Sequence, residues 1–279
     1  MAALTDLSDI VNRVTGGNNG TPEHLFFFRD SRVDAAAAAA TVAGRMTSLW
    51  QYEGNPAGGA APGAVAVPDN TTDGGLKQTD PGGSRTKWLL GCTASSSAAG
   101  TLILYDRLLH ISGLNGTTLT AQAVGGALTR YTGAESVGNQ IWVEVYTQIG
   151  ASGTTITAIY TDQGGDGGTT TATAIGATGL REAQRIISLP LASGDTGVRG
   201  VTSVTLAGTT GTAGDFGVSI VRPLAILPIG LLGSGTVRDF IAGLPSIPEI
   251  KTDACLALAW LANTTTAPQI FGSLHMIEA

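Results

Sequence analysis

Charged side chains are scarce in this chain. Lysine, arginine, aspartate and glutamate make up 13% of its 279 residues, about half of the usual share in globular proteins. The formal charge is −6 at pH 7, and the basic residues are scattered singly. Because nucleic-acid binding needs a basic patch that neutralises phosphates, we expect no nucleic-acid partner. Removing Thr, Ser and Gly from water costs less free energy than removing ions, so a surface dominated by these residues suits packing against neighbouring proteins.

Histidine and cysteine are also rare. None of His24, His110 and His275 has a second ligand at the spacing of a zinc motif, so we expect no metal site. His110 and His275 lie in apolar strand patterns, which favours hydrogen-bonded sheet histidines. Cys92 and Cys255 are far apart in sequence, and a reduced, buried pair is favoured over a disulfide.

Long apolar segments are missing as well. The longest, at 223–233, is interrupted by two prolines and a glycine and is too short to span a bilayer, so we expect no membrane partner. The first residues, MAALTDLSDIVNRV, lack a basic segment followed by an apolar one. We therefore expect no signal peptide and synthesis in the cytoplasm.

Recognisable catalytic motifs are absent from the sequence. There is no G-x-S-x-G pentapeptide, and the glycine-rich loops lack the Lys-Ser/Thr ending of a phosphate loop. We predict no catalytic residue, no cofactor and no small-molecule substrate, with a hydrolase built on a dispersed acidic pair as the alternative. The segment of the sequence most similar to a calcium loop is DQGGDGG, which holds Asp162 and Asp166. Two carboxylates supply few of the six to eight oxygens that calcium requires, so a simple turn is favoured.

The clearest structural signal lies at residues 141–162. Residues 141–149 alternate between apolar and other side chains, and residues 154–162 alternate again after a short glycine-containing turn. The pattern predicts an antiparallel hairpin whose first strand is half-buried. The side chains predicted to face the core are Ile141, Val143, Val145 and Ile149.

Similar segments fill the chain beyond residue 84. Turns rich in Gly, Thr and Asp separate about ten predicted strands, which is typical of an antiparallel β-sandwich or jelly roll, with a barrel as the alternative. Residues 254–262 are read as a strand, although a helix there is also consistent with their composition. The strands are predicted at 87–93, 101–111, 117–124, 141–149, 154–162, 169–175, 184–191, 198–207, 216–229, 254–262 and 268–277.

The first 84 residues differ in style. Apolar residues at helical spacing predict a short helix over 3–14, and alanine propensity predicts a second over 30–46. Residues 54–83 are so rich in Pro, Gly, Asn and Asp that a long loop is expected. We therefore predict an N-terminal arm at 1–84 and a β-sandwich domain at 85–279.

The predicted arm carries two groups of apolar side chains. They are candidate contacts with a neighbouring subunit, because their burial at an interface would hold an otherwise extended arm in place. For the pair at 50 and 52, filling a small core of the chain itself is the alternative. The candidates are Leu25, Phe26, Phe27, Phe28, Trp50 and Tyr52.

The Thr-, Gly- and Ala-rich strand pattern of residues 85–230 resembles that of virion structural proteins of tailed bacteriophages. The resemblance rests on WVEVYTQIGASGTTITAIYTDQGG and VTSVTLAGTTGTAGDFGVSIVRPLAILPI, which follow an arm without an export signal. Among these proteins the chain looks most like a capsid decoration, or cement, protein, although it is much longer than small decoration proteins.

This resemblance implies a structural virion protein on the capsid surface. Its partners would be the major capsid protein and copies of itself, in a homotrimer, with the arm reaching over a neighbour. Two alternatives remain at this stage: a tail, collar or head-fibre component, and a carbohydrate-binding jelly-roll module, which would need an exposed aromatic patch.

Overall fold

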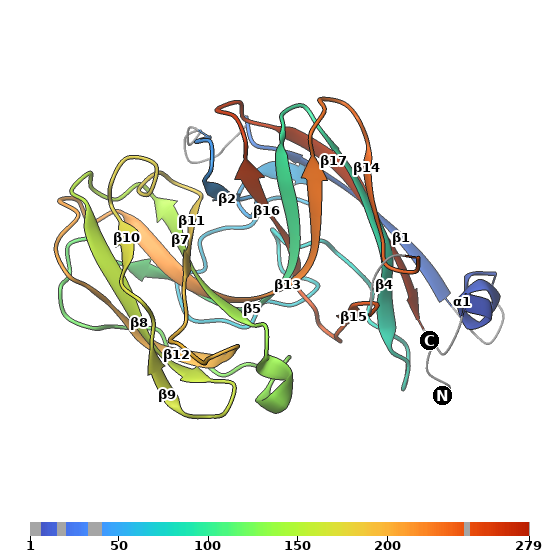
Figure 1. The fold of residues 1–279 in the computed structure, drawn as a ribbon, viewed down its shortest axis with the longest axis horizontal. Coiled ribbons are helices and arrows are strands. Elements are labelled where there is room, and N and C mark those ends of the chain that lie inside the picture. Colours follow the sequence, from blue (N-terminus) through green and yellow to red (C-terminus); the bar gives the residue numbers. More distant parts are fainter. Residues whose placement is uncertain (1–6, 16–20, 33–40, 243–245, 279) are drawn as a thin grey trace.

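The computed structural model describes residues 7–15, 21–32, 41–242 and 246–278. These residues form a mainly β protein whose strand pairs are antiparallel, as predicted (Figure 1). One α-helix, α1 (Leu7–Val14), lies within the predicted range 3–14. No helix in the described ranges is long and apolar enough to cross a membrane.

The strands form two open sheets and a closed barrel. The six-stranded sheet has the order β14 (Thr236–Asp239), β4 (Lys87–Ser96), β17 (Gln269–Glu278), β1 (Thr21–Asp30) and β3 (Glu53–Asn55), with β15 (Glu249–Ile250) also paired to β4. The five-stranded sheet has the order β10 (Thr173–Ile175), β8 (Thr154–Asp162), β12 (Val198–Leu206) and β6 (Gln122–Ala123), with β9 (Gly167–Thr169) beside β8. The barrel runs β11 (Arg185–Leu189), β2 (Met46–Ser48), β16 (Leu256–Ala262), β5 (Gly100–Leu114), β13 (Asp215–Ile229) and β7 (Gln140–Thr147).

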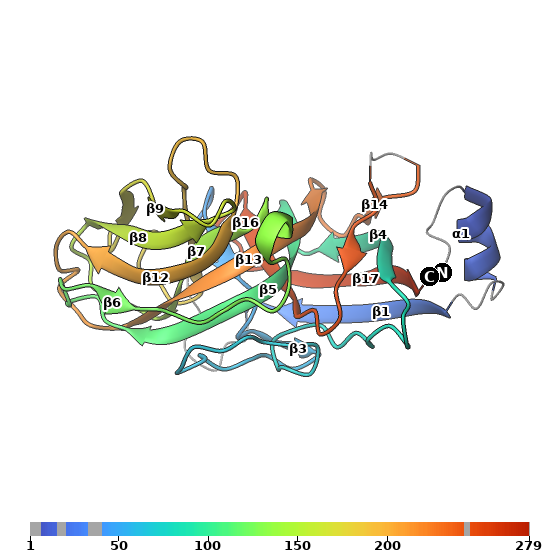
Figure 2. The ribbon, with the colours of Figure 1, turned by 90° about the horizontal axis from the view of Figure 1, so that it is seen from below.

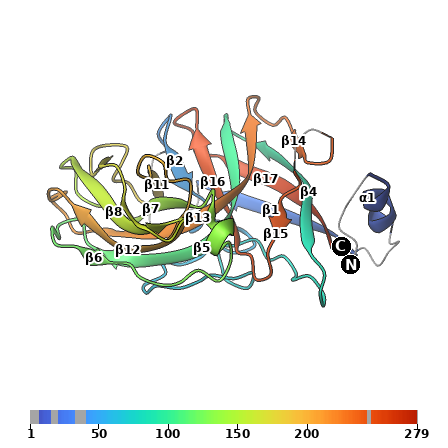
Figure 3. The ribbon, with the colours of Figure 1, turned by 60° about the horizontal axis from the view of Figure 1, so that its bottom comes forward.

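The barrel lies between the two open sheets (Figures 1 and 3). Its long strands β5 and β13 run from one side of the molecule to the other, so each contributes to both halves. The five-stranded sheet covers one part of the barrel wall and the six-stranded sheet covers another, which gives a separate apolar core on each side and a third core inside the barrel.

Strand β7 shows how alternation sorts side chains between these cores. Ile141, Val143 and Val145 pack towards the five-stranded sheet, as predicted. Trp142 and Tyr146, on the opposite face, pack inside the barrel, so the strand is buried on both faces rather than half-buried. Period-2 alternation identifies the two faces, but it cannot tell whether the second face meets water or another layer.

The predicted hairpin at 141–162 is wrong in its pairing. β7 pairs with β11 and β13, whereas β8 pairs with β9, β10 and β12. The short segment between them therefore crosses from the barrel to the five-stranded sheet. Both strands point their predicted apolar faces into the core that the two layers share.

Residues 256–262 form strand β16, so the helical alternative is excluded. Leu256, Leu258 and Trp260 pack towards the six-stranded sheet, while Ala257 and Ala259 face the barrel interior. The small alanines leave room for the aromatic rings inside the barrel. A strand that is buried on both faces has a continuous apolar sequence without alternation. For this reason the sequence of 254–262 is consistent with either a strand or a helix.

The segment before residue 84 is not a separate arm. β1 pairs with β17 along its whole length, and β2 closes the barrel between β11 and β16. The predicted second helix lies mostly at 33–40, outside the described residues, and its flanking residues 30–32 and 41–46 are not helical.

The irregular segment 54–83 is a long loop, as predicted, but it folds back on the chain (Figure 2). The indole Nε1 of Trp50 donates to the carbonyl of Ala60 at 2.9 Å. Gly74 has a left-handed φ of +94°, and a Cβ there would lie 2.5 Å from the Trp50 ring. The loop therefore closes over the end of the barrel instead of reaching outward.

A buried ion pair lies inside the barrel. Arg107 Nη2 donates to Glu144 Oε2 at 2.6 Å and also to the Tyr146 hydroxyl, and its guanidinium lies 4.3 Å from the centre of the Trp50 ring. Burial lowers the pKa of Arg107, but the combined effect of Glu144, Tyr146 and Tyr105 exceeds it, so the net pKa is raised. The guanidinium is therefore charged and depends on Glu144 for compensation.

A second ion pair joins the barrel wall to a loop. Arg130 binds Asp106 through two hydrogen bonds of 3.0 Å and also donates to the carbonyls of Pro68 and Arg107. Asp106 accepts a further hydrogen bond from the backbone N–H of Cys255. Both cysteines of the chain are free and buried, as expected.

His110 is held as a neutral imidazole beside this network. Arg107 Nε donates to His110 Nδ1 at 2.9 Å, so that nitrogen is an acceptor. Burial, followed by the charge of Arg107, lowers the pKa of His110 to about 3. The expectation of a hydrogen-bonded sheet histidine is confirmed.

We expect Val145→Asp to lower the free energy of unfolding by more than about 3 kcal/mol, because it buries an unpaired charge in the core. The matched control is Ile159→Asp on β8, since Ile159 is 48% exposed. Chemical denaturation measures both. An unchanged midpoint for Val145→Asp would contradict the packing described for β7.

Glu144→Gln is expected to cost about 3 to 5 kcal/mol, because it leaves the Arg107 charge buried without its counterion. Asp73→Asn breaks the exposed Lys77–Asp73 pair and should cost less than about 1 kcal/mol. If both variants lowered the free energy of unfolding by the same amount, the buried pair would contribute no more to stability than the exposed pair.

His110 should make stability depend on pH. Its folded-state pKa lies below the ordinary value of 6.5, so the unfolded chain takes up a proton first and stability falls as the pH drops below 6.5. Between pH 7 and pH 5 we expect this residue to account for a loss of about 2 kcal/mol. His110→Gln should reduce that loss, as measured by denaturation at the two pH values. An identical pH dependence in the variant would argue against a buried neutral imidazole.

Candidate interaction surface

The outer face of the six-stranded sheet carries several large exposed apolar side chains. The strand register aligns them in rows across β1, β17, β4 and β14. One row holds Phe28, Phe271 and Ser95. The next holds Phe26, Ser273, Thr93 and Val237, and the third holds His24, His275, Gly91 and Asp239. We call these positions the outer aromatic face.

The outer aromatic face exposes three large apolar side chains. Phe26 is 72% exposed, Val237 69% and Phe271 53%. Phe28 and Phe271 stack with their ring centres 4.6 Å apart, which holds both rings in place. Hydroxyl side chains of Thr93, Ser95 and Ser273 lie among them. Aromatic groups with few charges are typical of the centre of a protein–protein interface.

The candidate contact residues divide between this face and the interior. Phe26 and Phe28 point outward, so they are available to a partner. Leu25 and Phe27 point inward, because neighbours in a strand alternate, and they pack in the core beneath the sheet. Trp50 and Tyr52 are fully buried, so the alternative of filling a core of the chain itself is correct for them.

Three residues near the end of the chain also belong to this face and were not predicted from the sequence. Phe271 and His275 lie in β17, and Val237 lies in the short strand β14. Phe271 and His275 alternate with buried residues of β17, which marks an exposed face. Nothing in the sequence indicates that β1 is their neighbour. Only the pairing of β1 with β17 brings the two sets together.

A groove borders the face where α1 packs on the sheet. Its volume is about 350 Å³, and it is lined by Val14, Pro22, His24, Val237, Ile241 and His275, among others. Ile10 anchors the helix against Leu90 and Ile277. Leu7, Val11 and Val14 of the same helix stay exposed, so the apolar surface continues onto α1.

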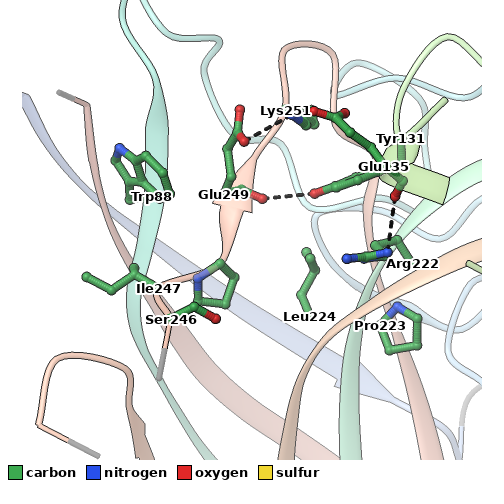
Figure 4. A pocket seen from close by; sticks show the side chains of 11 residues that line it. Trp88, Tyr131, Glu135, Arg222, Pro223, Leu224, Ser246, Ile247, Glu249 and Lys251 are labelled. Atoms are coloured by element: carbon green, nitrogen blue, oxygen red, sulfur yellow. Dashed lines mark hydrogen bonds and ion pairs between the residues drawn. The ribbon is translucent and has the colours of Figure 1, made fainter. Parts of the chain in front are cut away.

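A second cleft, of about 490 Å³, separates the loop around Tyr131 from β15 and β13 (Figure 4). Lys251 pairs with both Glu135 and Glu249, and the hydroxyl of Tyr131 donates to the carbonyl of Glu249. Arg222 stacks on Tyr131 and donates to the carbonyl of Glu135. The positive and negative side chains thus neutralise one another. Their contacts hold the loop around Tyr131 against β15, which indicates a structural role for the residues of this cleft.

The Asp162 loop has the geometry of a turn. Asp162 Oδ1 accepts hydrogen bonds from the backbone N–H groups of Gly164, Gly165 and Asp166 at 2.7, 2.7 and 2.9 Å. These bonds lower the pKa of the carboxyl group. In the described residues, no three His, Cys, Asp or Glu side chains gather as a metal-binding group. The turn interpretation accounts for the loop.

No protein-family model and no curated protein sequence matches the chain. Among solved structures, it has weak similarity to structures of infectious bursal disease virus. For the Gt strain, identity is 8% over 93% of this chain and 81% of the other, with a TM-score of 0.19. For the Gx strain, identity is 9% over the same shares, again with a TM-score of 0.19. Scores this low carry no argument about fold or function.

Proposed function

We propose that this chain is a structural virion protein that assembles by burying its outer aromatic face against a neighbouring subunit. The observation that carries the proposal is the group of exposed Phe26, Phe271 and Val237 in two adjacent rows of the sheet, together with Phe28, which stacks on Phe271. A preformed aromatic surface binds with little loss of conformational entropy. The role is a mechanical one and requires no catalysis.

The free energy gained by covering these side chains suits assembly in many copies. Covering a half-exposed phenylalanine gains about 1 to 2 kcal/mol, so each copy would add a modest contact that repetition makes strong. The low content of charge elsewhere on the chain fits a protein surrounded by neighbours, because few ions must be desolvated.

The more specific form of the proposal is a decoration, or cement, subunit on a bacteriophage capsid. The sequence pattern of residues 85–230 supports it, and so do the exposed aromatic side chains of the six-stranded sheet. In this form the partners are the major capsid protein and further copies of the chain, in a homotrimer. The contact is made by the sheet, not by an extended arm.

A second candidate is a carbohydrate-binding module of a phage fibre. It needs exposed aromatic side chains, and the outer aromatic face supplies them beside the hydroxyls of Thr93 and Ser273. The two candidates differ in a measurable way. A cement subunit is present in the particle in many copies and protects the shell, whereas a glycan-binding module binds soluble oligosaccharides.

We expect the double variant Phe26→Ser, Phe271→Ser to fold normally and to lose incorporation into particles of the virus that encodes the chain. Two lost apolar contacts of about 1 to 2 kcal/mol each weaken binding by roughly thirtyfold to a thousandfold. Quantitative mass spectrometry of purified particles measures the copy number.

The matched control is Ile159→Ser, which removes an exposed apolar side chain from the five-stranded sheet. It should leave the copy number unchanged. Normal incorporation of the double variant would contradict the proposed docking face, and absence of the wild-type chain from the particles would contradict a virion role.

A further inference from the structure

Two histidines from opposite ends of the chain meet on the outer aromatic face. His24 of β1 lies directly opposite His275 of β17 in the strand register. Their Nδ1 atoms share a hydrogen bond of 3.0 Å, and the rings are perpendicular, with centres 4.8 Å apart. The two residues are separated by 251 positions in sequence, so no spacing motif could reveal the pair.

The ring of His275 is oriented by a chain of hydroxyl groups. Its Nε2 lies 3.1 Å from Ser273 Oγ, which in turn lies 2.8 Å from Thr93 Oγ1. Because these contacts engage Nε2, the other ring nitrogen is directed at His24. Metal-binding histidines are commonly held in this way, by a polar partner on the nitrogen that does not bind the metal.

The separation of the two nitrogens fits a shared metal ion. Zinc–nitrogen bonds are about 2.0 to 2.1 Å long, so two ligands of a tetrahedral ion lie roughly 3.3 Å apart. The observed 3.0 Å needs an adjustment of only a few tenths of an ångström. The adjoining groove of about 350 Å³ leaves space for water molecules on the ion.

We propose that His24 and His275 form a surface site for a divalent ion of the zinc, nickel and copper class, with water completing its coordination. Imidazole favours these ions over magnesium and calcium, which prefer oxygen ligands. Among the described residues no third His, Cys, Asp or Glu joins the pair as part of a metal-binding group. A bound ion would connect β1 with β17. This proposal is independent of the virion role.

The test is isothermal titration calorimetry of the full chain with zinc chloride and nickel chloride at pH 7.5. We expect saturable binding of one ion per chain for each metal. His24→Ala and His275→Ala should each weaken it at least tenfold, and Ser273→Ala should weaken it less. Magnesium chloride should give no binding heat. The circular dichroism spectrum of each variant checks that it still folds.

The matched control is Cys92→Ala, because Cys92 also lines the groove and a thiolate is a strong zinc ligand. It should leave affinity unchanged. As a second readout, the ring nitrogen resonances of His24 and His275 should shift together on titration with zinc. Absence of saturable binding in the wild type would overturn the proposal, and so would binding that survives both histidine variants or that disappears in Cys92→Ala.

Discussion

The pairing of Arg107 with Glu144 inside the barrel is the constraint on which the rest of the fold depends. Two full charges in an apolar interior are tolerated only when they meet at close range, and here they lie 2.6 Å apart. Arg107 belongs to β5 and Glu144 to β7, which are joined through β13. The pair ties two walls of the barrel together, and the barrel wall supplies one layer of each flanking core.

The outer aromatic face follows from that arrangement. The barrel strands β5, β13 and β16 pack against one side of the six-stranded sheet, and α1 covers only the part of the other side around Leu90 and Ile277. The inward residues of β1 enter the shared core, so alternation places Phe26 and Phe28 outside. A sheet supported from behind in this way presents its exposed side chains in fixed positions, as a repeated assembly contact requires.

The antiparallel β class, the core face of β7 and the helix near the N-terminus could be predicted, because each depends on local periodicity. The partner of each strand could not, since alternation defines faces and not neighbours; hence β7 and β8 were expected to form a hairpin. Arg107 and Glu144 gave no sign of burial in the sequence. His24 and His275, or Phe28 and Phe271, meet only through the pairing of the first and last strands.

The central claim is that the outer aromatic face is covered in the assembled state. Hydroxyl-radical footprinting of the free chain and of the assembled particle measures this directly, residue by residue. The account predicts that oxidation of Phe26, Phe271 and Val237 falls sharply on assembly, while that of Ile159 stays the same. Equal oxidation of the three residues in both states would contradict it.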